Sequence, residues 1–199
     1  KDKSYARLHG IFDINQSSCQ IEAKKLNVKP YVSIEELLGD NEIDCVTIAT
    51  PHPMHAEHSI AALKAGKHVL CEKPMAVTVS EADKMIAQSK RSNRVLGICF
   101  QWRLNHMIVS AKQIIEEGVI GRPYRIYAET LGLYTATYYK AAPWKGTWEG
   151  EGGGFMLNNG PHAIDTMVYL VGMPKRVWGI SRTVLQDIET DDSVTAMLE

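Results

Sequence analysis

The sequence lacks long hydrophobic runs, an excess of charge of one sign, and clustered cysteines. Over its 199 residues, no apolar stretch approaches the roughly 18 residues that a membrane-spanning helix needs. The 22 basic and 23 acidic residues give a formal net charge of −1, which offers no electrostatic footprint for nucleic acid or an anionic membrane. We therefore expect small molecules or copies of the same chain as partners, and neither nucleic acid nor membrane.

The cysteines are few and far apart in the sequence: Cys19, Cys45, Cys71 and Cys99. The last three lie in or beside apolar strand-like runs, as free buried thiols do. No signal peptide is visible, because the charged segment 1–7 is not followed by an apolar segment of signal length. These features predict a reducing, cytoplasmic location. The chain begins without methionine and stops in what reads as a strand, so we expect it to be truncated at both ends.

Short apolar runs alternate with helix-like segments in the first hundred residues. The runs are Leu8–Phe12, Cys45–Ala49, His68–Cys71 and Val95–Phe100. This alternation is typical of a parallel sheet covered by helices. Local signals mark three helices: a capping box of Ser33 and Glu36, a glycine after residues 57–65 at Gly66, and an N-cap at Ser80 before residues 81–90.

The pattern changes after about Asn105. One helix-like segment around residues 107–115 ends at Gly118, and three segments of alternating polarity follow at 124–133, 176–185 and 193–198. Such alternation is typical of strands with one exposed face, which are mostly antiparallel. Residues 134–154, rich in Tyr, Trp and Gly, predict a long loop that forms either an aromatic lid or part of the core.

Polar residues follow each of the four strand-like runs. They are Asp13, Thr50-Pro51-His52, Glu72-Lys73-Pro74 and Gln101. In an open parallel sheet the ligand cleft lies outside the carboxyl ends of the strands. Any one of these residues alone is more simply explained as the polar start of a loop. Together they predict a binding site.

Asp13 stands where an acid in a dinucleotide-binding fold accepts hydrogen bonds from the adenosine ribose hydroxyls. No arginine follows within a few residues to pair with a 2′-phosphate, which favours NAD over NADP. The glycine-rich phosphate loop that normally lies about 20 residues earlier is not in the sequence. A single acid after a strand is a weak signal by itself.

Lys73 is a candidate catalytic residue. Pro74 biases it towards an extended backbone, which would aim the ammonium group away from the sheet. A lysine held in a cleft can keep its positive charge against a substrate hydroxyl or a developing alkoxide. The alternative is an exposed Glu72–Lys73 pair in a turn, which would contribute little.

His162 is a candidate acid or base. A helix that begins near Pro161 would place His162, Asp165 and Tyr169 on one polar face. Asp165 could then set the tautomer of the imidazole. A structural histidine satisfied by its neighbours is an equally good reading of the residues alone.

A metal site is not expected. His55 and His58 are three residues apart and His52 lies near them, but no convergent set of carboxylates accompanies the histidines. His162 likewise has no second histidine or cysteine at ligand spacing.

Two segments resemble a known family. "IDCVTIATPHPMHAEHSIAALKAGKHVLCEKPMAVTVSEADKMI" (43–86) and "GGGFMLNNGPHAID" (152–165) are similar to the glucose–fructose oxidoreductase and inositol dehydrogenase family, Gfo/Idh/MocA. The resemblance covers essentially the whole chain. It implies a doubly wound α/β Rossmann domain over residues 1–101 and an α+β domain with a mostly antiparallel open sheet over residues 102–199. That sheet would form a homodimer or homotetramer.

The resemblance also implies roles for individual residues. Asp13 would hold the adenosine ribose, Lys73 would be the catalytic lysine and His162 the acid or base. The dinucleotide cleft would be lined by Thr50, Pro51, His52 and His55, with Glu72 and Gln101 near the nicotinamide. Asn158 stands four residues before His162, where many sugar-alcohol dehydrogenases of the family have aspartate, and it cannot take up a proton. Members with asparagine there resemble nucleotide-sugar and uronate oxidases.

The implied function is that of a dehydrogenase that transfers a hydride between NAD and a secondary hydroxyl of a sugar, sugar acid or cyclitol. Two alternatives stay open at this point. One is an NAD-dependent glycosidase that works by transient oxidation and elimination, and the other is a non-catalytic dinucleotide-binding regulatory protein.

Overall fold

Three parallel strands lie side by side in the first half of the chain, in the computed structural model, which describes residues 6–199. They are β3 (Cys45–Ile48), β4 (His68–Cys71) and β5 (Leu96–Ile98), in the order β3-β4-β5. Parallel pairing in register brings the carboxyl ends of all three to the same edge. The α/β prediction is confirmed, and β4 has the predicted bounds.

A smaller parallel pair precedes this sheet. β1 (Gly10–Ile11) pairs with β2 (Lys29–Pro30), and the helices α1 (Gln16–Leu26) and α2 (Ile34–Gly39) follow the two strands. The strand predicted over Leu8–Phe12 is therefore shorter than expected. Within the predicted strand, only Gly10 and Ile11 pair with residues of β2.

Two helices cover the three-stranded sheet and build the core. α3 (His55–Lys64) and α4 (Val79–Ser92) pack against each other and against the sheet. The core cluster consists of Ile48, Ala56, Ala62, Leu63, Val69, Cys71 and Met85. Leu63 and Met85 are completely buried, and burying a side chain of this size stabilises the fold by about 1.5–3 kcal/mol.

The helix ends follow from local hydrogen bonds. Gly66 follows α3 with a φ of 76°, as predicted. α4 begins two residues earlier than predicted, because Thr78 and not Ser80 forms a capping box with Glu81. The Ser33 side chain caps α2, but Glu36 accepts from Val32 N at 2.9 Å and not from Ser33 N, so half of the predicted box is wrong.

Helices dominate the start of the second half. The 3₁₀ helix η2 (Gln101–Leu104) and α5 (His106–Glu116) follow β5, and α5 packs against α9 (Gly160–Val171). The segment 134–154 is not a plain loop, since it contains α6 (Ala136–Lys140) and α7 (Trp148–Glu151). Thr135 and Thr147 cap these two helices with their side chains.

An antiparallel pair ends the chain. β6 (Val177–Arg182) pairs with β7 (Ser193–Leu198) over six residues, which confirms two of the three predicted strands. Residues 124–133 join none of the sheets formed by residues 6–199, so the third strand prediction is wrong. Alternating polarity describes one face of a segment, whereas a strand also needs a hydrogen-bonded neighbour.

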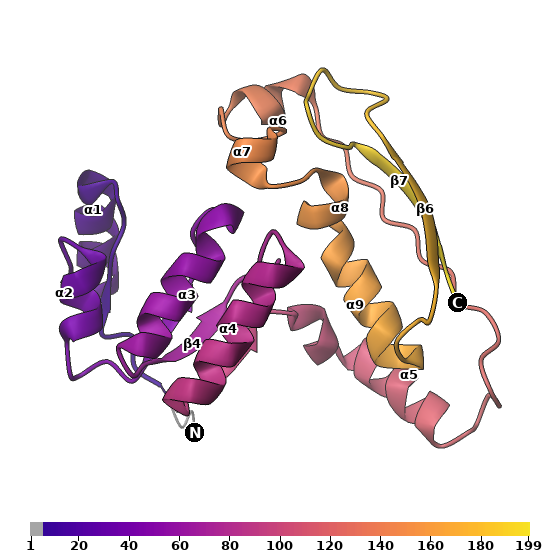
Figure 1. Cartoon of the computed structure of the whole chain (residues 1–199), viewed down its shortest axis with the longest axis horizontal. Helices are drawn as coiled ribbons and strands as arrows, with labels where there is room; N and C mark the ends of the chain where they lie inside the picture. Colours follow the sequence, from indigo (N-terminus) through magenta and orange to yellow (C-terminus); the bar gives the residue numbers. More distant parts are fainter. Residues whose placement is uncertain (1–5) are drawn as a thin grey trace.

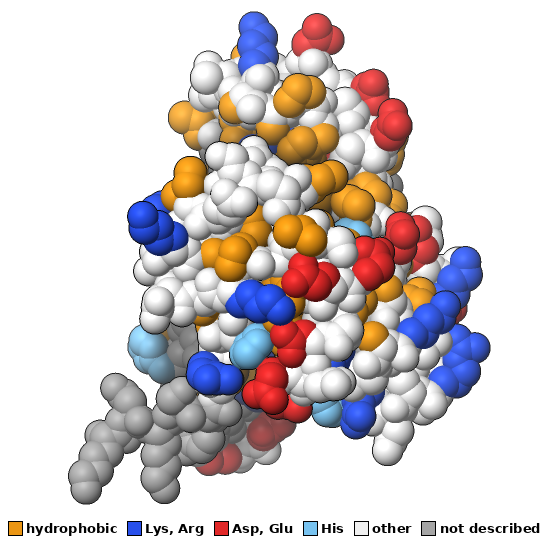
Figure 2. Space-filling model, turned by 90° about the vertical axis from the view of Figure 1, so that its left-hand side faces the viewer, with side chains coloured by type: hydrophobic (Ala, Val, Ile, Leu, Met, Phe, Trp, Pro, Cys, Tyr) orange, Lys and Arg blue, Asp and Glu red, His pale blue; other side chains and the backbone are white. Residues whose placement is uncertain are grey.

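Figure 1 shows how these parts are arranged. α8 (Phe155–Asn158) and α9 lie between the helices of the first half and the β6–β7 sheet, while α6 and α7 lie at the top of the view. Figure 2 shows basic and acidic side chains interspersed over one face, with hydrophobic side chains gathered in its upper part. None of the helices in residues 6–199 is long and apolar enough to cross a membrane.

The four cysteines are free. Cys71 is buried as predicted and Cys99 is partly buried. Cys45 is exposed, contrary to expectation, because it begins β3, the outer strand of the β3-β4-β5 sheet.

Candidate functional site

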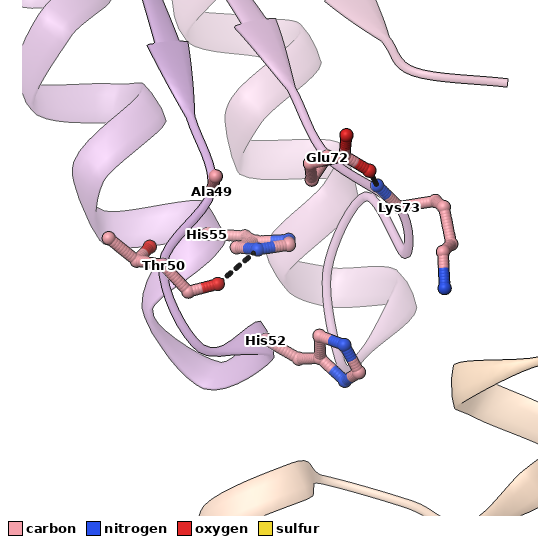
Figure 3. Close-up of a pocket in the computed structure, with 6 residues that line it drawn as sticks. All are labelled: Ala49, Thr50, His52, His55, Glu72 and Lys73. Carbon is pink, nitrogen blue, oxygen red and sulfur yellow. Dashed lines mark hydrogen bonds between the residues drawn. The ribbon is translucent and has the colours of Figure 1, made fainter. Parts of the chain in front are cut away.

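A cleft of about 220 Å³ lies at the carboxyl ends of β3 and β4. It is lined by Ala49, Thr50, His52, His55, Glu72 and Lys73 (Figure 3). The structure thus brings two of the four predicted strand-end groups together. They meet because neighbouring parallel strands end at the same edge, as the sequence argument required.

His55 ties the two strand-end loops to each other. The ring is 1% exposed, its Nδ1 lies 2.7 Å from Pro74 O and its Nε2 lies 2.8 Å from Thr50 O. Both nitrogens are therefore engaged by backbone carbonyls. His55 supports the wall of the cleft from behind and has no free nitrogen for a ligand.

Lys73 reaches from the first half of the chain to the second. Figure 3 shows its side chain extending away from His55 and from the sheet, as predicted. Its Nζ donates to Asn158 O at 2.6 Å and lies 3.4 Å from Asn158 Oδ1. Burial lowers the pKa of Lys73, while the negative charges of Glu72 and Glu151 oppose that shift.

Asn158 in turn bonds to a carboxylate that sequence reasoning missed. Its Nδ2 donates to Glu151 Oε1 at 2.7 Å, and the backbone N of Gly146 donates to Glu151 Oε2 at 2.7 Å. Glu151 is only 3% exposed. The one signal in the sequence was an acid directly before three glycines in a segment that had been predicted as a loop.

The backbone of Glu151 also fixes His52. His52 Nδ1 donates to Glu151 O at 3.1 Å, which leaves Nε2 of the neutral ring as an acceptor. Burial lowers the pKa of His52, so the neutral ring is favoured. A ligand hydroxyl in the cleft could donate to that nitrogen.

His162 lies near Lys73 and Glu72, whose charges both act on it. Its ring stacks on Trp102 at 4.9 Å with the planes 14° apart, and its Nδ1 is buried with no hydrogen-bond partner in the described part of the chain. Burial, and then the positive charge of Lys73, lower the pKa of His162. A neutral imidazole with an unused nitrogen is suited to accepting a proton.

Asp165 does not make the predicted contact with His162. Its two oxygens accept from Arg103, Nε at 2.8 Å and Nη2 at 2.5 Å. The bidentate pair joins α9 to η2, the helix that carries Trp102. Arg103 and Trp102 were also missed, because neither lies near His162 in the sequence.

The cleft lining does not include six of the predicted site residues, namely Asp13, Pro51, Gln101, Asn158, His162 and Asp165. Asp13 is exposed, and its Oδ1 accepts from Asn15 N at 2.7 Å at the approach to α1. Gln101 is exposed and begins η2, where Cys99 Sγ lies 3.9 Å from its Oε1. Their predicted roles at the ribose and the nicotinamide stay predictions. Within residues 6–199, no three His, Cys, Asp or Glu side chains form a group that could hold a metal ion.

The glycines after Glu151 let the two halves approach closely. Gly152 has a φ of 78°, and a Cβ there would lie 2.5 Å from Val77 Cγ2. A Cβ on Gly154 would collide with the backbone oxygen of Asp191, which accepts from Phe155 N. A side chain at Gly152 would therefore press on the first half, and one at Gly154 would disturb the contact of Asp191 with the start of α8.

Comparison with known families gives two matches that together cover nearly all of the chain. Residues 1–100 match an oxidoreductase family with an NAD-binding Rossmann fold, GFO_IDH_MocA. Residues 108–199 match the GFO/IDH/MocA C-terminal domain.

Individual relatives carry named activities. The chain is 34% identical over 145 residues to 1,5-anhydro-D-fructose reductase of Ensifer adhaerens, covering 72% of this chain and 42% of the relative. It is 38% identical over 136 residues to levoglucosan dehydrogenase of Pseudarthrobacter phenanthrenivorans, covering 68% and 35%. The chain therefore spans less than half the length of these curated relatives.

Among solved structures, the chain is similar to the WlbA dehydrogenase of Bordetella pertussis in complex with NADH and UDP-GlcNAcA. The TM-score is 0.91 at 30% identity, and the match covers 97% of this chain and 60% of the other.

Proposed function

The chain belongs to the Gfo/Idh/MocA family of oxidoreductases, and from this premise we propose that it oxidises a secondary hydroxyl of a sugar, sugar acid or cyclitol, with NAD as cofactor. The observation that carries the proposal is the contact of Lys73 Nζ with Asn158 O at 2.6 Å. Asn158 ends α8, and α9 with His162 begins two residues later at Gly160. A cation from one half therefore lies near the imidazole of His162 from the other, close enough to act on its charge.

The groups on the cleft fit a dinucleotide. The carboxyl ends of parallel strands are where such cofactors bind, and Thr50 and His52 offer polar atoms there. The Nδ1 of His162 is a buried polar atom without a hydrogen-bond partner in the described part of the chain, so the imidazole keeps an unused nitrogen. When bound, NAD would supply the hydride acceptor. Asp13, exposed and without an arginine close behind it, supports NAD over NADP.

Three residues of the chain have separate roles in the proposed oxidation. Lys73 donates a hydrogen bond to the substrate oxygen and stabilises the negative charge that develops on it. His162, kept neutral by burial, accepts the hydroxyl proton. The C–H bond breaks with its electron pair leaving as hydride, and the same carbon becomes a carbonyl. Trp102 holds the imidazole ring in place by stacking.

The order of substrates to be tested follows from the relatives. The chain is similar to the WlbA dehydrogenase, whose structure contains UDP-GlcNAcA. We therefore place sugar acids first among the substrates to be screened, ahead of neutral sugars and cyclitols.

The test is an NADH-absorbance screen over sugar acids, neutral sugars and cyclitols, followed by the variant Lys73→Ala. With a confirmed substrate, we expect kcat to fall at least about a hundredfold, since loss of one stabilising donor costs that much. Lys84→Ala is the matched control, because Lys84 is exposed on α4. Unchanged turnover in Lys73→Ala would refute the assignment. Release of an aglycone without accumulation of NADH would instead support the glycosidase hypothesis.

We also propose a homodimer or homotetramer formed through the β6–β7 sheet. Trp178, Ile180 and Met197 share one face of this sheet and are 47%, 60% and 64% exposed, although their side chains are apolar. Contiguous apolar surface of this kind marks interaction sites. Light scattering on the protein and on Ile180→Glu should give an oligomer and a smaller species, respectively. Four free thiols support the cytoplasm as the proposed location.

A further inference from the structure

We propose that Glu151 is a positioning residue of this site: it orients the amide of Asn158 and so holds Lys73, and it supplies the carboxylate charge that Asn158 lacks. The inference rests on the proposed function, because it concerns the same lysine. No motif pointed to Glu151, and its contacts alone identify it.

Glu151 is a buried anion whose partners are neutral. The residue is 3% exposed, and its two oxygens accept from Asn158 Nδ2 and from the backbone N of Gly146, each at 2.7 Å. Burying a carboxylate without a nearby cation is costly. Lys73 is a cation close enough to interact with it electrostatically, and Asn158 stands between the two.

The carboxylate permits only one orientation of the amide. With Nδ2 facing Glu151, Oδ1 of Asn158 faces Lys73 Nζ at 3.4 Å. The reverse orientation would set an oxygen against the carboxylate and an NH₂ group against the ammonium. Lys73 therefore donates to the amide oxygen of Asn158, and the amide NH₂ group donates to Glu151. The amide thus bridges an ammonium group and a carboxylate.

Glu151 also reaches the other wall of the cleft. Its backbone oxygen accepts from His52 Nδ1 at 3.1 Å, so the same residue contacts the partner of Lys73 and a lining residue of the cleft. Gly152, directly after it, allows the close approach to the first half. Displacement of α7 would therefore move both contacts together.

The charged and titratable groups around Lys73 are Glu72, Glu151, His52 and His162. Both carboxylates raise the pKa of Lys73 against the lowering effect of burial. Loss of the Glu151 charge should therefore lower the pKa of Lys73 further, while the Glu72 contribution remains.

The decisive variant is Glu151→Gln, which keeps the shape and removes the charge. Gly146 N and Asn158 Nδ2 donate to different oxygens of Glu151, and glutamine replaces one of these oxygens by an NH₂ group, so one of the two hydrogen bonds loses its acceptor. If the Asn158 amide turns over to compensate, its NH₂ group faces Lys73. We expect kcat to fall about tenfold to a hundredfold, as for a misplaced catalytic group. We also expect the Lys73 titration, followed by NMR of ¹³C-methylated lysines without substrate, to move to lower pH.

The double variant Glu151→Gln with Asn158→Asp provides the rescue. Its glutamine oxygen can accept from Gly146 N, and its amide group can donate to the new carboxylate at position 158. Both hydrogen bonds are retained and the charge moves towards Lys73. We expect the Lys73 titration to return to wild-type pH or above, and at least part of the lost kcat to return.

Glu149→Gln is the matched control, because Glu149 lies on the same helix with an exposed side chain. It should change neither kcat nor the titration. An unchanged Lys73 titration in Glu151→Gln, or a double variant that fails to restore it, would overturn the inference. The NMR measurement needs no turnover. Absence of hydride transfer in the wild type would therefore defeat the proposed function and leave the test of Glu151 intact.

Discussion

The two halves of the chain bury different kinds of side chain. In the first half the fully buried side chains are mainly apolar, with Leu63 and Met85 at the centre of the β3-β4-β5 core. Within residues 102–199, no hydrophobic side chain is fully buried, and the buried polar ones are Glu151 and Thr190. The first half is held by hydrophobic packing. The second half meets it through hydrogen bonds and close glycine contacts, which gather at the site.

Truncating the core of the first half should have the largest effect on stability. Leu63→Ala removes a completely buried side chain and should lower the free energy of unfolding by about 2–5 kcal/mol. Leu185→Ala, at a residue that is 80% exposed, should change it by less than about 0.5 kcal/mol. Urea denaturation followed by circular dichroism measures both. If both variants lost the same free energy of unfolding, the apolar surface of the second half would be covered in solution.

Breaking the polar junction of α9 with η2 should affect activity more than stability. Asp165→Asn removes one oxygen acceptor and the charge from the bidentate pair with Arg103, which lies next to Trp102 under His162. We expect kcat/KM to fall about tenfold, equal to about 1.4 kcal/mol of transition-state stabilisation. Asp83→Asn, at an exposed position on α4, serves as the comparison. Equal kinetics in both variants would show that the pair does not position His162.

A helix cap in the first half tests a smaller, local contribution. Thr78→Ala removes the capping box of α4 and should lower the free energy of unfolding by about 1 kcal/mol. Thr78→Ser should retain most of the stability, and Ser80→Ala should have no measurable effect. Thermal denaturation distinguishes the three. A loss in Ser80→Ala as large as that in Thr78→Ala would contradict the observed cap.

The pH profile tests the second half without any substitution. His162 acts as a base when neutral, and its lowered pKa keeps it neutral to lower pH, so the acidic limb of kcat/KM should lie below the ordinary histidine value of 6.5. Lys73 acts when charged, and its lowered pKa means that the alkaline limb should lie below 10.5. An acidic limb at or above 6.5, or an alkaline limb at or above 10.5, would contradict the assigned burial.

The first half could be predicted well from the sequence because its signals are local. The β4 strand and the Glu72–Lys73 pair at its end follow from a short apolar run and its polar stop. Parallel topology then places neighbouring strand ends together without further information. The error at Ser80 was also local: Glu81 stands three residues after Thr78, which is the spacing of a capping box.

The site in the second half could not be predicted in full because its contacts are distant in sequence. Asp165 is three residues from His162, yet Arg103, 62 residues away, pairs with it. Glu151 is identified only by the structure, in which Asn158 of α8 lies between Glu151 and Lys73. Periodicity along one helix identifies a polar face. It does not identify which charged group from elsewhere in the chain that face will meet.

The glycines at 152 and 154 also limit how such a protein can diversify. A side chain at 152 would meet Val77 of the first half, and one at 154 would meet the backbone of Asp191, so both substitutions would disturb the segment that leads to Asn158. The exposed aromatic residues just before it, including Trp144 and Trp148, have no such restriction. An evolving or engineered lineage would therefore vary these exposed aromatic residues while inheriting the glycines unchanged.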